Sequence, residues 1–230
     1  TSDLNAPDAV PSGLDGHLLP GTQVSSELAD LAVPGCTLLS VLGQGGMGIV
    51  FLARQERLHR FVAVKMLNAE AAKDTAYLEH LEGEARTLAT LSHPNIVGCH
   101  DIVTTDQGTF LIMEFVPGQL SVRDLVTRFK HVPEALVARI ALETARGLSY
   151  AYDKGICHRD IKPDNLLLYR EEDAPPHTPE DALSGCHARV MICDFGIARE
   201  CKPSDGSNRA ILGSPAYMAP EQAFDLEHAD

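Results

Sequence analysis

Residues 158–165 read HRDIKPDN, a dense run of charged and polar side chains between two short apolar stretches. A second short motif, DFG, follows at residues 194–196, and GSPAYMAPEQA occupies residues 213–223. Each motif alone has an ordinary explanation as a polar loop or turn between buried segments. The order in which the motifs follow one another has no such ordinary explanation. Together with the upstream segments, this order decides the fold.

Upstream, a glycine-rich segment lies between two runs that are predicted to be strands, 37–42 and 49–53. Its pattern, Gly43-x-Gly45-x-x-Gly48, also occurs in dinucleotide-binding proteins, where the glycines open a helix. Here an apolar, β-branched run follows, which favours a hairpin whose backbone N–H groups can lie over phosphates. The sequence contains no Gly-x-x-x-x-Gly-Lys-Ser/Thr motif, which excludes a Walker-type phosphate loop.

Lys65 stands in the otherwise apolar run 61–67, which predicts a third strand. An unpaired lysine is costly to bury, so one interpretation is an edge strand with the ammonium group in solvent. The other interpretation is that the ammonium group holds phosphate oxygens and is itself held by a carboxylate. Glu84, in a helix predicted over residues 74–91, is the candidate for that carboxylate.

The remaining elements follow from periodicity and cap signals. Further strands are expected at 97–103 and 110–116, joined by a turn, and at 165–169 and 189–194. Ser121-x-x-Asp124 resembles a capping box and predicts a short helix ending near Phe129. A longer helix is predicted over 133–154. Its expected buried face consists of Leu136, Val137, Ile140, Ala141, Ala145 and Leu148.

Together, the glycine segment, VAVK at 62–65, HRDIKPDN, DFG and APE at 219–221 resemble a eukaryotic-type Ser/Thr protein kinase. GGMG at 45–48 and GSPAYMAPEQA are similar to the bacterial branch of that family, and the resemblance covers about residues 36–225. It implies an α+β, bilobal protein-kinase-like fold. The expected parts are a disordered acidic leader at 1–34, a β-rich N-lobe with one main helix at 35–116 and a partial, helical C-lobe at 117–230.

The resemblance also implies ATP-dependent phosphorylation of Ser/Thr hydroxyls on protein substrates, with ATP and Mg²⁺ as cofactors. Asp160 is expected to accept or orient the hydroxyl proton, and Lys162 to steady the γ-phosphate. Asn165 and Asp194 are expected to hold Mg²⁺. Lys65, paired with Glu84, is expected at the α- and β-phosphates. The glycines expected to cover the phosphates as a lid are Gly43, Gly45, Gly46 and Gly48. The side chains expected to pack on both faces of the adenine are Leu42, Val50, Ala63 and Leu167. The hinge is expected to consist of Met113, as gatekeeper, and the backbone of Glu114 and Val116.

Arg159 is placed to pair with a phosphate, which implies control by activation-loop autophosphorylation. Ser204 and Ser207 are the candidate acceptors, with two ordinary loop serines as the equal alternative. Ser214 lies where the family places a Ser or Thr that contacts the catalytic Asp. Cys193 is expected either to face the nucleotide pocket, open to alkylation, or to be a buried inert thiol.

The chain has 19 Lys and Arg against 32 Asp and Glu, a net charge of −13. This acidity argues against nucleic-acid partners, because binding phosphates requires a basic surface. No apolar run is long enough to span a bilayer, so no membrane contact is expected within this chain, while an anchor outside it stays open. Six cysteines without C-x-x-C spacing fit a reduced, cytoplasmic interior. The expected partners are protein substrates with Ser/Thr acceptors, and self-association for autophosphorylation is also allowed.

Two features depart from the family pattern. The spacing between Asn165 and Asp194 is longer than a hairpin needs, so the acidic stretch 170–188 is expected to be a surface insertion. The sequence also carries only the first part of the helical lobe, so helix 133–154 is expected to leave an apolar face uncovered. One alternative is a chain that is inactive without the rest of the C-lobe. A second is a non-catalytic ATP-binding scaffold, against which the presence of Lys65, Asp160, Asn165 and Asp194 together argues. A small-molecule phosphotransferase is a weaker third alternative, because 213–221 resembles a peptide-binding segment.

Overall fold

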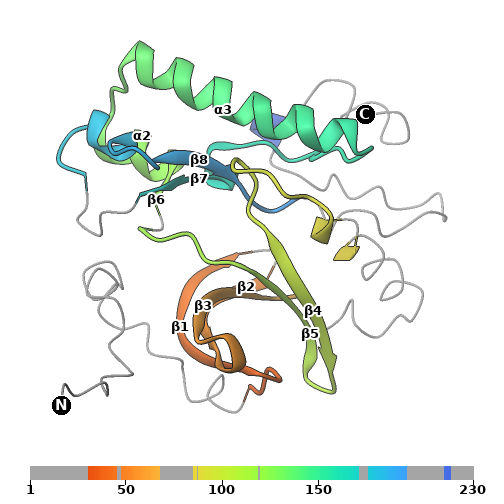
Figure 1. Ribbon diagram of the computed structural model, residues 1–230. Helices are drawn as coiled ribbons and strands as arrows, with labels where there is room; N and C mark the ends of the chain where they lie inside the picture. The colour runs from red at the N-terminus through yellow and green to blue at the C-terminus, as the bar shows by residue number, and fades with distance from the viewer. Residues whose placement is uncertain are drawn as a thin grey trace, which may run out of the picture.

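The computed structural model of the chain contains two adjoining halves, one built on a β-sheet and the other on helices and a smaller sheet (Figure 1). The residues it describes are 31–45, 48–67, 85–86, 88–118, 120–170, 176–195 and 215–218. The architecture is the α+β, two-part arrangement that the motif order predicts.

The first half is a five-stranded antiparallel sheet with the spatial order β1-β2-β3-β5-β4. Its strands are β1 (Cys36–Gly45), β2 (Gly48–Gln55), β3 (Arg60–Met66), β4 (Cys99–Thr105) and β5 (Gly108–Glu114). β-Branched and aromatic residues suit a pleated, half-buried surface, and they form the core on one face of this sheet. The core includes the fully buried side chains of Phe51, Val62, Val64, Phe110 and Ile112.

A glycine hairpin joins β1 and β2, as the sequence predicts. Gly45 and Gly48 face each other in the strand register. Gly48 has a φ of +124°, and a Cβ atom added there would lie 2.1 Å from the backbone oxygen of Met66. Only glycine fits this close approach to β3 without moving a backbone.

The second half contains a three-stranded antiparallel sheet and two helices. The strands β6 (Leu120–Ser121), β7 (Leu166–Tyr169) and β8 (Arg189–Ile192) lie in the order β6-β7-β8, and helix α2 (Val122–Phe129) follows β6 directly. The predicted capping box is present: Asp124 N–H donates to Ser121 Oγ at 3.1 Å, and Ser121 N–H donates to the Asp124 carboxylate at 2.9 Å.

Helix α3 (Glu134–Asp153) runs along the side of β7 and β8 that faces away from the five-stranded sheet (Figure 1). It ends before Gly155, which has a φ of +75°, a common helix stop. Within the described residues no helix, α3 included, is long and apolar enough to cross a membrane.

The buried face of α3 differs from the predicted one. Its buried residues are Leu136, Ile140, Glu143, Thr144, Gly147 and Ala151. Val137, Ala141 and Ala145 are exposed, so their predicted burial is wrong. The reason is that the polar side chains of Glu143 and Thr144 have hydrogen-bond partners inside the fold and can therefore be buried. The buried face of α3 is centred closer to these two residues than the predicted face is. The apolar surface expected to be uncovered is there, because Val137, Leu142 and Tyr152 are at least half exposed.

Part of the stretch 170–188 belongs to the core, so the prediction of a surface insertion is wrong for this part. It contains the short 3₁₀ helix η4 (Glu180–Leu183), and Ala182, Leu183 and Ala188 are buried in the same cluster as Ile140. Their apolar side chains fill space beside α3 and β8. Residues 171–175 lie outside the described part of the chain.

The last residues of the expected leader pack on the first sheet. Val33 is buried in the core of that sheet, and Ala32 N–H donates to Gln107 Oε1 at 2.8 Å. The prediction of a disordered leader is therefore wrong for 31–34, and residues 1–30 lie outside the described part. Of the helix predicted over 74–91, residues 85, 86 and 88–91 are described. Residues 85, 86, 88 and 89 are helical, whereas residue 90 is in a turn and residue 91 is outside the helix, so the predicted end is two residues too late.

Candidate active site

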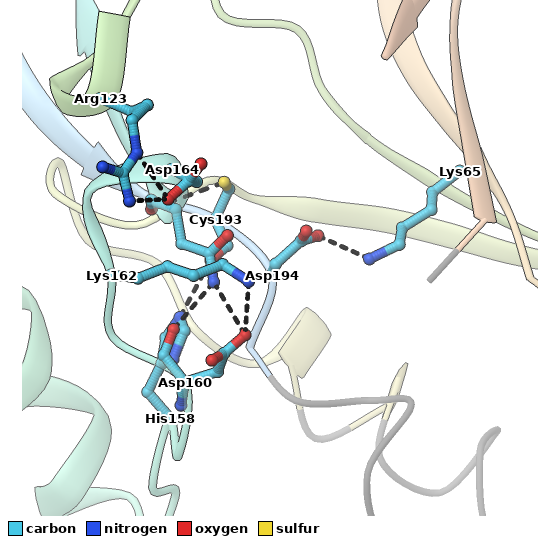
Figure 2. Close-up of polar contacts among 9 residues, drawn as sticks. Lys65, Arg123, His158, Asp160, Lys162, Asp164, Cys193 and Asp194 are labelled. Atoms are coloured by element: carbon cyan, nitrogen blue, oxygen red, sulfur yellow. Dashed lines mark hydrogen bonds and ion pairs between the residues drawn. The ribbon is translucent and has the colours of Figure 1, made fainter. Parts of the chain in front are cut away.

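Lys65 lies on β3, which is an inner strand between β2 and β5. The residue is only 7% exposed, and its Nζ is 2.8 Å from Asp194 Oδ1, a carboxylate 129 residues further along the chain. The interpretation of Lys65 as an outward-pointing lysine on an edge strand is therefore wrong. Figure 2 shows its side chain reaching Asp194 from the first sheet, so this pair connects the two halves of the molecule.

Asp160 is the centre of a second polar cluster, on the loop between α3 and β7. It is 6% exposed, and its Oδ2 is 3.1 Å from Lys162 Nζ. Asn165, at the end of the 3₁₀ turn η3 (Pro163–Asn165), donates from Nδ2 to the Asp160 backbone oxygen at 2.8 Å. The structure thus brings Asp160, Lys162 and Asn165 together, as the motif spacing predicts (Figure 2).

His158 joins the two clusters. Asp160 N–H donates to His158 Nδ1 at 3.2 Å, so Nδ1 carries no proton and Nε2 donates to the Cys193 backbone oxygen at 2.9 Å. The ring also packs against Phe195, with 4.6 Å between ring centroids. The neutral imidazole thereby fixes the Asp160 loop against the residue that precedes Asp194. This role of His158 was not predicted from the sequence, although the residue begins the motif.

Cys193 does not present a reactive thiol to this site. Its N–H donates to the Asn165 backbone oxygen at 3.0 Å, and its Sγ donates to the same oxygen at 3.5 Å. Burial, helped by the nearby Asp194 charge, raises the pKa of the thiol well above its usual range. Because the thiolate is the reactive form, the raised pKa disfavours alkylation of this partly buried thiol.

Two residues of the site have strained backbones. Arg159 and Asp194 have φ values of +63° and +59°, the left-handed region that residues with a Cβ rarely occupy. Such conformations cost about 1–3 kcal/mol each and persist where the surrounding structure enforces them, commonly at functional sites. Here the strained residue Asp194 is the one whose carboxylate meets Lys65.

The residues predicted around the adenine lie on neighbouring strands. In the strand register Val50 faces Lys65, and Ala63 faces Met113. Leu42 on β1 and Leu167 on β7 are half-buried. Their contact with a nucleotide stays a prediction.

Glu114 ends β5, where the hinge is predicted. Its N–H donates to the Gly98 backbone oxygen at 2.8 Å, and its Oε2 accepts from Gly98 N–H at 3.2 Å. These two hydrogen bonds tie the end of β5 to the start of β4. Val116, two residues further on, is buried.

An apolar cavity adjoins the Lys65–Asp194 pair. Its walls include Leu88, Met113 and Phe195, and β4 contributes Cys99. Burial raises the pKa of the Cys99 thiol to about 11. Met113 and Lys65 line the same cavity, so the predicted gatekeeper lies next to the predicted phosphate lysine.

Several predicted site residues lie outside the described part of the chain. They are Gly46 of the glycine lid, Glu84 as the partner of Lys65, and Ser204, Ser207 and Ser214 of the activation segment. Their roles stay predictions. Gly43, Gly45 and Gly48 of the lid are located by their strand pairing.

One further cluster was not predicted from the sequence. Arg123 on α2 donates to Asp164 Oδ2, with 3.3 Å from Nη2, and to the Tyr217 hydroxyl at 2.7 Å. Tyr217 belongs to the 3₁₀ turn η5 (Pro215–Tyr217), within the GSPAYMAPEQA motif. A helix, the Asp160 loop and this motif therefore meet beside the site. No local spacing indicates a contact among residues so far apart in sequence.

Comparison with known proteins agrees with this geometry. The protein kinase domain family matches residues 36–228. The serine/threonine-protein kinase PknF of Mycobacterium tuberculosis is 37% identical over 196 residues, which cover 84% of this chain and 39% of that protein. The probable serine/threonine-protein kinase CPE1738 of Clostridium perfringens is 34% identical, over 81% of this chain and 25% of that protein.

A solved structure is also similar. The crystal structure of the Mycobacterium tuberculosis PknI kinase domain superposes with a TM-score of 0.57 and 28% identity. The match covers 73% of this chain and 62% of that one. This chain spans well under half the length of the two curated relatives above.

Proposed function

The chain belongs to the protein kinase domain family, and on that premise we propose that the protein containing it transfers the γ-phosphoryl group of ATP to Ser/Thr hydroxyls of protein substrates. The observation that carries this proposal is the convergence of two clusters from distant segments. Lys65 meets Asp194 at 2.8 Å, and His158 links the neighbour of Asp194 to the Asp160 loop. Phosphoryl transfer asks a protein mainly for such positioning of charges.

The donor set fits Mg²⁺ with ATP, the cofactors that protein kinases generally use. Mg²⁺ prefers hard oxygen ligands, usually one or two carboxylates completed by phosphate oxygens. Asp194 offers a carboxylate, and Asn165 uses its Nδ2 on Asp160, which leaves its amide oxygen to act as a ligand. Among the described residues, no group of three or more His, Cys, Asp or Glu side chains could hold a metal ion. Phosphate oxygens of ATP would therefore have to complete the ligand set. Bound Mg²⁺·ATP would supply the phosphoryl group and neutralise its charge.

The chain's own residues would then do three things. Asp160 would accept or orient the proton of the substrate hydroxyl, in a position fixed by Asn165 and His158. Lys162, 3.1 Å from Asp160, would keep a positive charge beside the group being transferred. Lys65 would hold the α- and β-phosphates while paired with Glu84.

The remaining roles are proposed on the same basis. Adenine would lie between Leu42, Val50, Ala63 and Leu167, with Met113 beside it and the backbones of Glu114 and Val116 at its edge. The glycines at 43, 45, 46 and 48 would cover the phosphates. Residues 35–116 and 117–230 would act as the two lobes.

Arg159 is exposed, which supports a role in pairing with a phosphate on Ser204 or Ser207, and self-association would allow such autophosphorylation. We place the domain in the cytoplasm.

The test uses the full-length natural protein with labelled ATP, Mg²⁺ and a general Ser/Thr protein substrate. Asp160→Asn and Lys65→Met are expected to lose about 10²–10⁴-fold in transfer rate, the usual contribution of a positioned acid–base or charged group. Asp153→Asn removes an exposed carboxylate at the end of α3, so it is the matched control and should keep wild-type activity. Equal labelling by all four proteins would refute the proposal.

Two rival functions give different results in the same assay. A non-catalytic scaffold would bind a fluorescent ATP analogue without transferring label. A small-molecule phosphotransferase would leave the protein substrate unlabelled while consuming ATP in cell extract filtered to remove macromolecules.

A further inference from the structure

Strand β8 ends two residues before the proposed metal ligand, and its outer edge is fully paired. Val190 N–H donates to Glu143 Oε2 at 2.6 Å, and Asn95 Nδ2 donates to the Val190 oxygen at 2.8 Å. Ile192 N–H donates to the Asn95 oxygen, and Val97 N–H donates to the Ile192 oxygen, both at 2.9 Å. The other edge of β8 pairs with β7. Strand β8 is therefore hydrogen-bonded along both edges, and one acceptor on its outer edge is a side-chain carboxylate.

That carboxylate belongs to a buried residue of α3. Glu143 is only 9% exposed, and burying a charge is costly unless it is paired and hydrogen-bonded. Arg139, one helical turn earlier, donates from Nε to Glu143 Oε1 at 2.8 Å. One oxygen of the carboxylate thus binds arginine, while the other binds the backbone of β8.

The same arginine binds the insertion. Arg139 Nη1 donates to the Leu183 backbone oxygen at 2.6 Å, and Nη2 donates to the Ala188 backbone oxygen. Leu183 and Ala188 are both buried. The planar guanidinium group therefore spans α3 and the two ends of the segment 183–188, which runs directly into β8. Lysine has a single ammonium nitrogen and cannot reproduce this fork.

We propose that Arg139 and Glu143 are positioning residues for phosphoryl transfer, which fasten the insertion and β8 to α3 and so fix Asp194 for its metal. The inference rests on the proposed function of Asp194. Mg²⁺ demands near-ideal octahedral geometry, so a small displacement of β8 would weaken the metal site. His158 ties the Asp160 loop to Cys193, directly after β8, so the transfer rate should fall as well. The KM for protein substrate depends on contacts with the substrate chain and should change little.

The experiment compares variants of the full-length protein in two measurements. The first is the free Mg²⁺ concentration that gives half-maximal phosphorylation, with the KM for protein substrate as reference. The second is the affinity for Mn²⁺ of the protein–ADP complex, measured by electron paramagnetic resonance, which requires no catalysis. Thermal unfolding of each variant reports the folded fraction.

Arg139→Ala is expected to weaken both metal measurements by up to about 10-fold, because Arg139 acts on Asp194 only through Glu143 and β8 and about 10-fold is the lower effect of losing a direct partner of a metal ligand. Glu143→Gln keeps an acceptor for Val190 but loses the charge that Arg139 binds, so its effect should be smaller. Arg139→Lys keeps the charge and most of the side-chain volume without the fork, so it should recover part of the loss. Arg146→Ala, on the exposed side of the same helix, is the control and should match wild type.

The inference is overturned if Arg139→Ala and Arg139→Lys lower only the folded fraction. In that case the half-maximal Mg²⁺ concentration and the Mn²⁺ affinity of the folded protein would stay at their wild-type values. It is also overturned if the KM for protein substrate rises as much as the Mg²⁺ requirement. If the wild type transfers no phosphate but Arg139→Ala still weakens Mn²⁺ binding, the proposed function fails while the positioning role stands.

Discussion

Replacing Gly147 by alanine should destabilise the protein, although alanine is the better helix former. Gly147 lies on the buried face of α3, against β8 and the segment at Asn95. In the middle of a helix, alanine is favoured over glycine by about 1 kcal/mol. Any net loss must therefore come from the contacts that the new methyl group would make.

Those contacts are too short. A Cβ at position 147 would lie 2.8 Å from Ile192 Cδ1 and 3.0 Å from the Asn95 backbone oxygen, where carbon contacts normally lie at about 3.5–4.0 Å. Overpacking of this kind costs about 1–3 kcal/mol. The Asn95 oxygen also accepts from Ile192 N–H, so moving it weakens a hydrogen bond worth about 1 kcal/mol. After the helix gain of about 1 kcal/mol, which the hydrogen-bond loss offsets, the free energy of unfolding should fall by about 1–3 kcal/mol.

Thermal unfolding of the full-length protein, followed by far-ultraviolet circular dichroism, measures the effect. Each kcal/mol of this loss lowers Tm by about 2–4 °C in a domain of this length. Ser149→Ala, two residues away on the exposed face, gains helix propensity without new contacts and should raise the stability by about 0.5 kcal/mol. If Gly147→Ala is stabilised as much as Ser149→Ala, the packing of α3 on β8 described above is incorrect.

Three further changes have expected results of their own. Gly48→Ala forces a Cβ toward the Met66 oxygen at a φ of +124°, so it should raise the KM for ATP and cost about 1–3 kcal/mol, and an unchanged KM would contradict the proposed lid. Ser121→Ala removes the acceptor of Asp124 N–H at the start of α2 and should cost about 1 kcal/mol in urea unfolding, with Ser121→Thr, which keeps the hydroxyl, close to wild type. Because burial raises the pKa of Cys99 from 9.0 to about 11, the unfolded chain loses that proton first, so stability should fall as pH rises from about 9 to about 11. Cys99→Ala should flatten that fall in a series of Tm measurements, and an unaltered slope would exclude this thiol as its source.

Elements that local pattern determines were predictable from the sequence. The apolar run 49–53 and the glycines before it predict the hairpin, and Gly48 proves to be required by its contact with β3. The capping box at Ser121 and the helix that begins after Pro133 were predictable for the same reason, because cap and helix signals act within a few residues.

Properties that depend on distant partners were not predictable. Glu143 resembles a solvent-facing residue until β8 supplies a backbone N–H that needs an acceptor, 47 residues further on. Lys65 allowed two interpretations for the same reason, since the carboxylate that pairs with it comes from the other half of the molecule. Leu183 and Ala188 stand in an acidic stretch without periodicity, so nothing local indicates that they are buried.

The pairing of Val97 and Asn95 with β8 also limits how the molecule can open. These residues lead into β4 of the first sheet, yet their backbone groups complete a ladder in the second half. Pulling the halves straight apart would leave several backbone donors and acceptors without partners, each worth about 1–3 kcal/mol when buried. Lys65 and Asp194 come from opposite sides of this seam, so the backbone ladder between 95–97 and β8 sets the distance over which their ion pair can form.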